Sequence, residues 1–383
     1  MISSSLFKKR KNLLLLFLLV ILFVPVLVFF SYQRSKINTR SNAQVIQQQD
    51  SLGAKTMKIS TSPTTSQQPT AFVTSAPNPS HSVYLGMWTE GFWDESSYTL
   101  HPEKLTQLQG LIGKKVAIAH YYRGWENLGK PSIVTELQTI RDNGWRPMLS
   151  SNPYFFAECQ QNGKNLYKTI AGGGCDSFLQ KIGSNLKQYG KPLFLRFAWE
   201  MNIDSIDWST QKTTSSPADF VQAWRRFHDI IASEGATNVI WVWSPNVITP
   251  TSIPYASLYP GNSYVDWIGL DGYNWGKTQS WSNWQSFSQV FLQSYSSITS
   301  LAPTKPLMIA EVNTTDVGGD KPVWYQDMLA TQIPNNFPKV KAVLFYNETR
   351  MKQENVNWLI NVTPASLQSF MENIQNPMYL SSF

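Results

Sequence analysis

Eight short apolar runs, alternating with longer amphipathic stretches, occupy the sequence beyond residue 81. A short apolar run suits a buried strand and an amphipathic stretch suits a helix, so this order predicts a parallel sheet covered by helices. Eight strand–helix units over about 300 residues match a (β/α)8 barrel in size. The predicted strands are Val83–Met87, Val116–Tyr122, Pro147–Ser150, Leu193–Trp199, Val239–Trp243, Trp267–Leu270, Leu307–Ala310 and Val340–Tyr346.

The helices between these runs are predicted over Asp176–Tyr189, Pro217–Glu234 and Trp281–Ser300, among others. A doubly wound sheet is the rival fold, but it normally carries a glycine-rich phosphate turn after its first strand. The one glycine cluster, residues 171–175, has neither the spacing nor the position of such a turn. The barrel is therefore the predicted fold, over residues 81–383.

The first 30 residues read as a membrane anchor. A basic tail, residues 1–12, precedes an uncharged apolar stretch at 13–30, about the minimum length for crossing a bilayer. A cleaved signal peptide is the alternative, but the stretch is long for one and no small-residue cleavage site follows it. We expect an uncleaved transmembrane helix, with residues 1–12 as a short cytoplasmic tail and the barrel outside the cytoplasm at the cell surface. If the anchor is cleaved instead, the barrel is expected to be secreted.

Residues 31–80 are predicted to be a disordered linker, since they are rich in Ser, Thr, Gln and Pro and poor in aromatic residues. Residues 1–80 hold 9 Lys/Arg and one acid, which leaves 23 of the 32 basic and 24 of the 25 acidic residues for the barrel. A nucleic-acid-binding domain would carry a basic surface of its own. The nearly neutral barrel is therefore not expected to bind nucleic acid.

The only two cysteines, Cys159 and Cys175, lie sixteen positions apart in one predicted loop region. A disulfide between them fits an oxidising compartment outside the cytoplasm. Two reduced, buried thiols are the alternative, because the sequence does not show that the sulfurs meet.

Two glutamates, Glu200 and Glu311, end the fourth and seventh apolar runs. Functional groups of a (β/α)8 barrel gather at the carboxyl ends of its strands. Strand alternation puts Arg196, Ala198 and Glu200 on one face, and likewise Leu307, Ile309 and Glu311, so both carboxylates are predicted to point into one barrel mouth. Solvated strand ends or an ion pair with Arg196 are the structural alternatives.

At these residues the sequence resembles glycoside hydrolase family 26, which includes β-mannanases and mixed-linkage β-glucanases. The resemblance covers roughly residues 82–372. It rests on four motifs, found in order on the predicted strands: Arg196-Phe-Ala-Trp-Glu-Met-Asn202, Trp241-Val-Trp-Ser-Pro-Asn246, Tyr259 to Asn274, and Lys305-Pro-Leu-Met-Ile-Ala-Glu311. The resemblance implies that Glu200 is the acid/base and Glu311 the nucleophile, with Arg196 and Tyr273 supporting them.

Two positions depart from the family pattern. Trp199 stands where the family usually has a histidine before the acid/base, and Asn313 stands where it often has a glycine. The reaction type depends on the two carboxylates, which are present; a retaining enzyme needs them roughly 5 Å apart. The substrate is less defined, because Trp199 changes both hydrogen bonding and shape beside the acid/base.

All fifteen tryptophans lie between Trp88 and Trp358, a density typical of proteins that stack aromatic rings on sugars. Several are expected to be core residues instead. Residues near the predicted strand ends are the candidates for sugar binding: Arg196, Trp199, Asn202, Trp243, Asn246, Asp271, Tyr273, Asn274, Trp275 and His120. For Asp271 the alternative is an N-cap or loop-anchoring role, and for His120 it is a structural role.

Other chemistries lack their residues in this sequence. There is no His-Glu-x-x-His and no cluster with metal-ligand spacing, so no catalytic metal or other cofactor is expected. There is no Gly-x-Ser-x-Gly elbow, which disfavours an esterase.

These features together predict a membrane-tethered, retaining endo-glycosidase, most simply a monomer, that hydrolyses a β-linked polysaccharide such as mannan or β-glucan. The rival hypothesis is a non-catalytic polysaccharide-binding protein on a decayed glycosidase scaffold that assists surface-polymer assembly.

Overall fold

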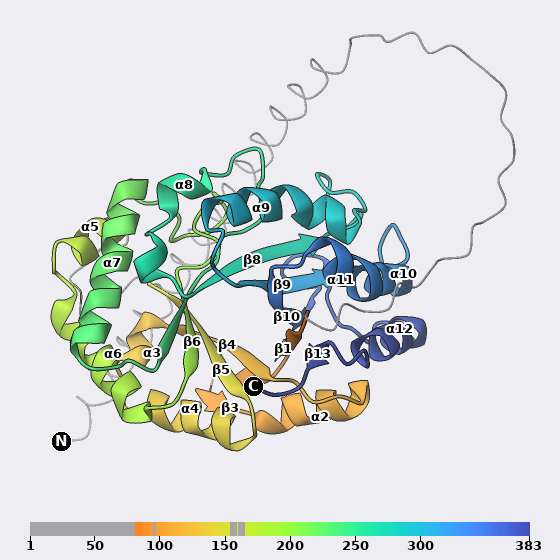
Figure 1. The fold of residues 1–383 in the computed structure, drawn as a ribbon, viewed down its shortest axis with the longest axis horizontal. Helices are drawn as coiled ribbons and strands as arrows, with labels where there is room; N and C mark the ends of the chain where they lie inside the picture. The colour runs from red at the N-terminus through yellow and green to blue at the C-terminus, as the bar shows by residue number, and fades with distance from the viewer. Residues whose placement is uncertain (1–80, 95–96, 154–158, 160–164) are drawn as a thin grey trace, which may run out of the picture. The chain divides into compact units, whose positions relative to one another are not determined.

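The computed structural model describes residues 81–94, 97–153, 159 and 165–383. Eight parallel strands follow one another around a closed barrel, in which β10 pairs back with β1 (Figure 1). The predicted (β/α)8 barrel is thereby confirmed, and each of the eight apolar runs falls on a barrel strand. These strands are β1 (Val83–Thr89), β4 (Ile118–Gly124), β5 (Arg146–Asn152), β6 (Leu193–Phe197), β7 (Val239–Trp243), β8 (Trp267–Asn274), β9 (Leu307–Thr314) and β10 (Val340–Asn347).

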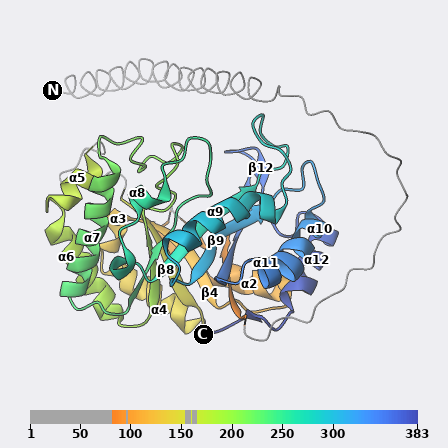
Figure 2. The same cartoon turned by 45° about the horizontal axis from the view of Figure 1, so that its top comes forward.

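Helices surround the strands on the outside of the barrel (Figures 1 and 2). Their bounds are α2 (Pro102–Ile112), α3 (Trp125–Leu128), α4 (Ser132–Asp142), α5 (Leu166–Ala171), α6 (Asp176–Tyr189), α7 (Pro217–Ser233), α8 (Tyr255–Leu258), η2 (Asn262–Tyr264), α9 (Phe287–Leu301), α10 (Lys321–Gln326), η3 (Asp327–Gln332), α11 (Ile333–Asn336) and α12 (Pro364–Ile374).

The start of α9 corrects one prediction. The apolar pattern extended this helix back to Trp281, but it begins only at Phe287. Ser286 and Gln289 form a capping box there, in which each side chain accepts from the other residue's backbone N–H. Such a box satisfies free N–H groups and so fixes where a helix begins. Residues 275–286 are consequently a loop at the carboxyl end of β8.

Short strands decorate the barrel. A hairpin of β2 (Trp93–Asp94) and β3 (Thr99–Leu100) follows β1, and a second pair, β11 (Thr349–Arg350) and β12 (Val356–Asn357), follows β10. The last strand, β13 (Tyr379–Leu380), pairs with the start of β1.

Side chains that alternate along the strands form two cores. A small inner cluster fills the barrel and includes Met148, Phe194, Val242, Met308 and Leu344. A much larger cluster lies between the strands and the helices. The lower part of the barrel is thus a packed, apolar interior, as in other (β/α)8 barrels, and polar groups are left to its carboxyl end.

Phe383 covers the opposite, amino-terminal end of the barrel. Its ring stacks on Tyr84 with centroids 3.9 Å apart and packs against Phe194. The guanidinium of Arg146, at the first residue of β5, lies 3.4 Å from the centroid of the Phe383 ring. Aromatic stacking and a cation–π contact therefore act together on this one side chain.

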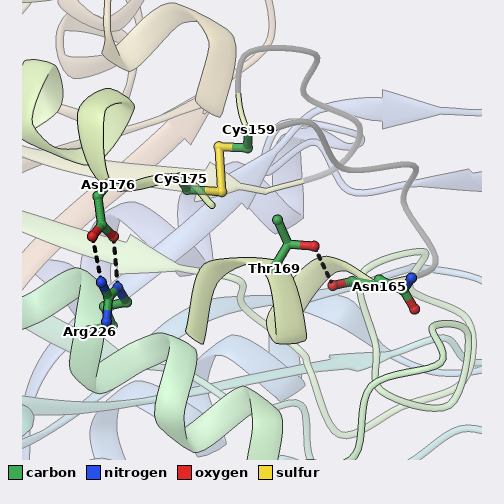
Figure 3. Close-up of a disulfide and its surroundings, with 6 residues drawn as sticks. All are labelled: Cys159, Asn165, Thr169, Cys175, Asp176 and Arg226. Carbon is green, nitrogen blue, oxygen red and sulfur yellow. Dashed lines mark hydrogen bonds and ion pairs between the residues drawn. A yellow bond between two sulfur atoms is a disulfide. The ribbon is translucent and has the colours of Figure 1, made fainter. Parts of the chain in front are cut away.

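The cysteine pair and the segments before the barrel complete the comparison with the predictions. The structure joins Cys159 to Cys175, the residue just before α6, while Asp176 at the start of α6 pairs with Arg226 of α7 (Figure 3). The predicted tail (1–12), anchor (13–30) and linker (31–80) lie outside the described residues and stay predictions. Among the helices that the structure describes, none has the length and apolar character of a membrane span.

We predict that Phe383→Ala destabilises the barrel by about 1–2 kcal/mol, since it removes one aromatic stack and one cation–π contact. Urea unfolding of the full chain measures this difference. Leu292→Ala is the matched control, because Leu292 is a comparably exposed apolar residue, 48% against 43% exposed. Equal stability of the two variants would contradict the role of Phe383.

Candidate active site

The two candidate glutamates lie at the carboxyl ends of non-adjacent strands. Glu200 follows β6, the fourth barrel strand, and Glu311 lies within β9, the seventh. Both side chains belong to the polar layer above the inner apolar cluster. The route by which each reaches that layer differs from the one that strand alternation predicted.

Glu200 sits in a turn rather than on an extended strand. β6 ends at Phe197, and Ala198 and Glu200 have φ values of 46° and 54°, in the left-handed region that non-glycine residues rarely adopt. The N–H of Ala198 donates to Ser151 O and that of Glu200 donates to Ser244 O, so the turn remains bonded to its neighbours on both sides. Backbone strain of this kind is concentrated at functional sites.

A β-bulge turns Glu311 inward. Leu307 and Ile309 pack in the outer cluster, whereas Met308 and Ala310 belong to the inner one. The predicted face shared by Leu307, Ile309 and Glu311 is therefore wrong. Leu270 pairs with Ile309 but Asp271 pairs with Glu311, so one extra residue in β9 shifts the alternation. Only this bulge brings the carboxylate of Glu311 into the barrel mouth.

Three donors hold the carboxylate of Glu311, which is 6% exposed. Tyr122 Oη donates to Oε1 at 2.7 Å, and Tyr273 Oη donates to Oε2 at 2.6 Å. Arg196 forms an ion pair with Oε1. Burial and the charge of Glu311 raise the pKa values of Tyr122 and Tyr273 well above the usual range, so both phenols stay protonated as donors. Glu311 is thus fixed in place as an anion.

Arg196 organises the floor of the site and is itself fully buried. Its Nη1 donates to both oxygens of Asp271, at 2.8 and 2.9 Å. Its Nε donates to Ser150 Oγ at 2.6 Å. Burial opposes its charge, but Asp271 and Glu311 outweigh that effect and raise the pKa of Arg196. The predicted residues Arg196, Asp271 and Tyr273 therefore do meet at Glu311.

His120 supports this floor from one side. Its Nε2 lies 2.7 Å from Ser150 Oγ and the ring is 1% exposed. Burial and the nearby charge of Arg196 lower the pKa of His120 well below its usual value, so the ring is neutral. Because Ser150 accepts from Arg196, its hydroxyl proton is free to be donated to His120. This corresponds to the structural alternative for His120.

Glu200 lies in a different electrostatic setting. It is partly exposed, and its Oε1 accepts from Asn246 Nδ2 at 2.5 Å. Burial is the main cause that raises the pKa of Glu200, and the charge of Glu311 is the next, giving a value of about 7. One carboxyl is therefore bound as an anion while the other retains its proton near neutral pH, which is the division of roles that acid and nucleophile require.

The tryptophans predicted at the site separate into two groups. The indole of Trp199 packs between Tyr122 and Trp208, with Arg196 5.2 Å from its ring centroid, so it belongs to the site. Trp275 packs on Tyr273. Trp243, by contrast, is fully buried on the outer face of β7 and donates to Leu258 O. Its position at a strand end misled the prediction, because alternation turns it toward the helices.

Two of the predicted asparagines, Asn202 and Asn274, have structural roles. Asn202 is fully buried and bonds both the N–H and the carbonyl of Asn246, which orients the residue that contacts Glu200. Asn274, also fully buried, accepts from the N–H groups of Gly276 and Gln285 and so ties the two ends of one loop together. Sugar binding by these two side chains is not supported by their burial.

Asn313, the second departure from the family pattern, cross-links neighbouring segments by hydrogen bonds. It is fully buried and donates to the carbonyls of Tyr346 and Trp358, while its Oδ1 accepts from Tyr325 Oη and Thr314 N. Both N–H groups and both oxygen lone pairs of its amide are therefore used within the protein. The residue at this position therefore builds the wall beside Glu311 rather than leaving it open.

Sequence reasoning missed Tyr122, Ser150 and a group at the end of β10. Glu348 accepts from Trp88 Nε1 at 2.8 Å and from Tyr346 Oη at 2.6 Å, which fixes the residue that links β10 to β11. The available signal was position: Tyr122 and Tyr346 end two predicted strands. No group of His, Cys, Asp and Glu side chains in the described ranges is arranged to hold a metal ion.

Comparison with known proteins shows which sequences this chain resembles. Residues 165–324 match the sequence model described as glycosyl hydrolase family 26. Endoglucanase H of Acetivibrio thermocellus is 32% identical over 276 residues, which are 70% of this chain and 29% of that protein. A mannan endo-1,4-beta-mannosidase of Bacillus subtilis is 25% identical over 290 residues, 67% of this chain and 73% of that protein. The chain thus spans less than a third of the first of these relatives.

Solved structures agree on the fold. A GH26 beta-mannanase from Bacteroides ovatus superposes with a TM-score of 0.56 at 14% identity, covering 79% of this chain and 90% of that one. GH26C from Muricauda sp. gives a TM-score of 0.57 at 17% identity, covering 78% of this chain and 87% of that one. At these identities the likeness concerns the barrel architecture.

We predict that Glu311→Gln lowers the pKa of Glu200 from about 7, because it removes the negative charge that contributes most after burial. The remaining burial keeps the pKa above 4.5. Titration of the glutamate side-chain carboxyls by 13C NMR measures the shift. Glu354→Gln is the matched control: the charge of Glu354 also raises this pKa but is the smallest of its causes. A shift no larger with Glu311→Gln than with Glu354→Gln would contradict the coupling.

Proposed function

The barrel of this chain belongs to glycosyl hydrolase family 26, and we propose that it is a retaining endo-glycosidase acting on a β-linked, neutral polysaccharide. The observation that carries the proposal is the asymmetry of the two glutamates. Glu311 is held as an anion by Arg196, Tyr122 and Tyr273, whereas Glu200 has a pKa near 7. Retaining glycosidases need one ionised carboxylate as the nucleophile and one protonated carboxyl as the acid.

In the proposed first step, a carboxylate oxygen of Glu311 attacks the anomeric carbon of the bound sugar. The bond between that carbon and the glycosidic oxygen breaks, and the proton of Glu200 passes to the leaving oxygen. This step yields a glycosyl ester on Glu311 and a Glu200 carboxylate. In the second step, Glu200 takes a proton from a water, the water oxygen attacks the same carbon, and the ester bond between that carbon and Glu311 breaks. The sugar is released with its original configuration, and the Glu311 carboxylate and the Glu200 acid are restored.

The floor residues act through Glu311. The phenols of Tyr122 and Tyr273 and the guanidinium of Arg196 donate to the attacking carboxylate and orient it. Asn246 holds Glu200 by its Oε1. The separation of the two carboxyls, expected to be roughly 5 Å for retention, remains a prediction.

Mannan or β-glucan is the proposed substrate class. The names of the relatives support it, since one is an endoglucanase and one a mannan endo-1,4-beta-mannosidase. Trp199 stands where the family usually has a histidine. An imidazole has two polar nitrogens, whereas the packed indole of Trp199 has a single N–H donor. The contact beside the acid/base is therefore more apolar than the family pattern implies.

We predict that the full chain releases reducing ends from mannan, glucomannan or mixed-linkage β-glucan, with a rate that falls as pH rises through about 7, where Glu200 loses its proton. Glu200→Gln lowers kcat on polymer by about 10²–10⁴-fold, because it removes general acid catalysis. The same substitution lowers kcat less on an aryl glycoside, because its leaving group needs no proton. Glu311→Ala abolishes turnover of both substrates.

The controls separate the assignments. Glu90→Gln removes an exposed carboxylate beside the mouth and is expected to keep wild-type activity. Proton NMR of the first-formed anomer reports retention; inversion would overturn the double displacement. No release from any polymer, combined with measurable polymer binding, would favour the rival hypothesis of a non-catalytic binding protein.

We also propose that residues 13–30 anchor this enzyme in a membrane, with the barrel outside the cytoplasm and residues 31–80 as a tether. The apolar stretch supports the anchor, and the paired cysteines Cys159 and Cys175 support an oxidising compartment. A monomer is the simplest state compatible with a site built from one barrel.

We predict that the full chain stays in the membrane fraction after an alkaline carbonate wash. Leu18→Arg with Leu22→Arg places two charges in the stretch, each costing about 2.5–3.5 kcal/mol at the centre of a bilayer, and moves the protein to the soluble fraction. Ser41→Arg with Gln47→Arg adds the same charges in the linker as a control. Retention of the Leu18/Leu22 variant in the washed membranes would contradict the anchor.

A further inference from the structure

Trp281 is a large aromatic side chain, 60% exposed, in the loop that joins β8 to α9. Single exposed apolar residues are common and need no functional reason. Trp281 differs from such residues in two respects: its ring continues a row of aromatic rings that begins at the candidate nucleophile, and its loop is bonded at several points.

The row of rings starts at Tyr273, whose hydroxyl donates to Glu311. The ring of Trp275 lies 6.3 Å from that of Tyr273 between centroids, and the ring of Trp281 lies 5.5 Å from that of Trp275. Exposure increases outward along the row, from the partly buried Tyr273 and Trp275 to Trp281. The spacing of successive rings is about the length of one sugar unit in a β-linked chain.

A buried tryptophan supports the row from behind. Trp358 is 2% exposed, and its ring centroid lies 4.8 Å from that of Tyr273 and 5.0 Å from that of Trp275. Its carbonyl accepts from the buried amide of Asn313 in β9. The inner two rings of the row are therefore packed against the same wall that borders Glu311.

The loop that carries Trp281 is fixed to the barrel. Asn274 Oδ1 accepts from the N–H groups of both Gly276 and Gln285, near the two ends of the loop. Ser282, the neighbour of Trp281, donates to Gly276 O at 2.8 Å, and Gln279 Nε2 donates to Glu354 O. Gly276 has φ 52°, and a Cβ there would lie 2.1 Å from Val317 O, so the loop needs glycine at this turn.

We propose that Trp281, continued inward by Trp275, is a distal sugar-binding platform that binds a pyranose unit of the polysaccharide away from the cleavage point. The inference rests on the proposed function and adds to it a specificity element outside the catalytic centre. A flat indole binds the apolar face of a neutral sugar ring without requiring charge. Because the loop is already held in place, little conformational entropy is lost on binding.

The test compares Trp281→Ala, Trp281→Phe and Tyr98→Ala in the full chain. Tyr98 is the matched control, since it is an exposed aromatic residue (61%) on the β2–β3 hairpin and lies outside the row. KM and kcat are measured on oligosaccharides of two to six units of the substrate that the polymer panel identifies. Trp281→Ala is expected to raise KM about five- to tenfold for the longest oligosaccharides and the polymer.

For the shortest oligosaccharides that are cleaved, Trp281→Ala is expected to leave kcat/KM within twofold of wild type, since they do not reach the platform. Trp281→Phe restores most of the affinity for long chains, and Tyr98→Ala behaves as wild type. A uniform effect of Trp281→Ala at every chain length, or no effect at any, would overturn the proposal.

A binding experiment makes the outcome independent of turnover. The Glu311→Ala variant, with and without Trp281→Ala, is titrated with soluble polymer, and binding is followed by calorimetry. Loss of affinity only in the double variant supports the platform, even if no polymer is hydrolysed by the wild-type protein. Equal affinity of the two variants would refute the platform and leave the proposed hydrolysis untouched.

Discussion

The guanidinium of Arg196, fully buried at the floor of the barrel mouth, is the charge around which the site is arranged. A buried cation is costly unless it is paired and hydrogen-bonded. Here Asp271 accepts two hydrogen bonds from it, Ser150 accepts a third, and Glu311 forms an ion pair with it. With one cation already shared by two carboxylates, ionisation of Glu200 would add a third negative charge without a partner. Burial is the main cause of the raised pKa of Glu200, and the negative charge of Glu311 adds to it.

In the same arrangement, buried side chains hold in place the side chains that line the barrel mouth. Side chains that line the barrel mouth are oriented by side chains behind them: Asn202 positions Asn246, His120 and Ser150 support Arg196, and Asn313 fixes the wall at Trp358. Their hydrogen bonds lie in the low-dielectric interior, where an unpaired polar group costs most, so each holds its partner in one geometry. Preorganisation of this kind lets a carboxylate act without waiting for the protein to rearrange.

Strand alternation predicted the right residues at the mouth for a partly wrong reason. It placed Arg196 correctly, because β6 is regular up to Phe197. It failed beyond, since the left-handed turn at Ala198 and Glu200 and the bulge before Glu311 both break the period of two. It also failed to exclude Trp243, which faces the helices. A bulge depends on pairing with two neighbouring strands, and no local pattern reports it.

By itself the sequence determined the eight strands, the barrel fold and the position of two glutamates at strand ends, because apolar periodicity and the order of apolar runs along the chain are local properties. Tertiary structure alone decided how those glutamates differ. Whether a carboxylate is a bound anion or a protonated acid depends on which residues, distant in the chain, donate to it and how much water they exclude. Tyr122, Tyr273 and Arg196 meet Glu311 from three different strands, and that meeting is a property of the folded barrel.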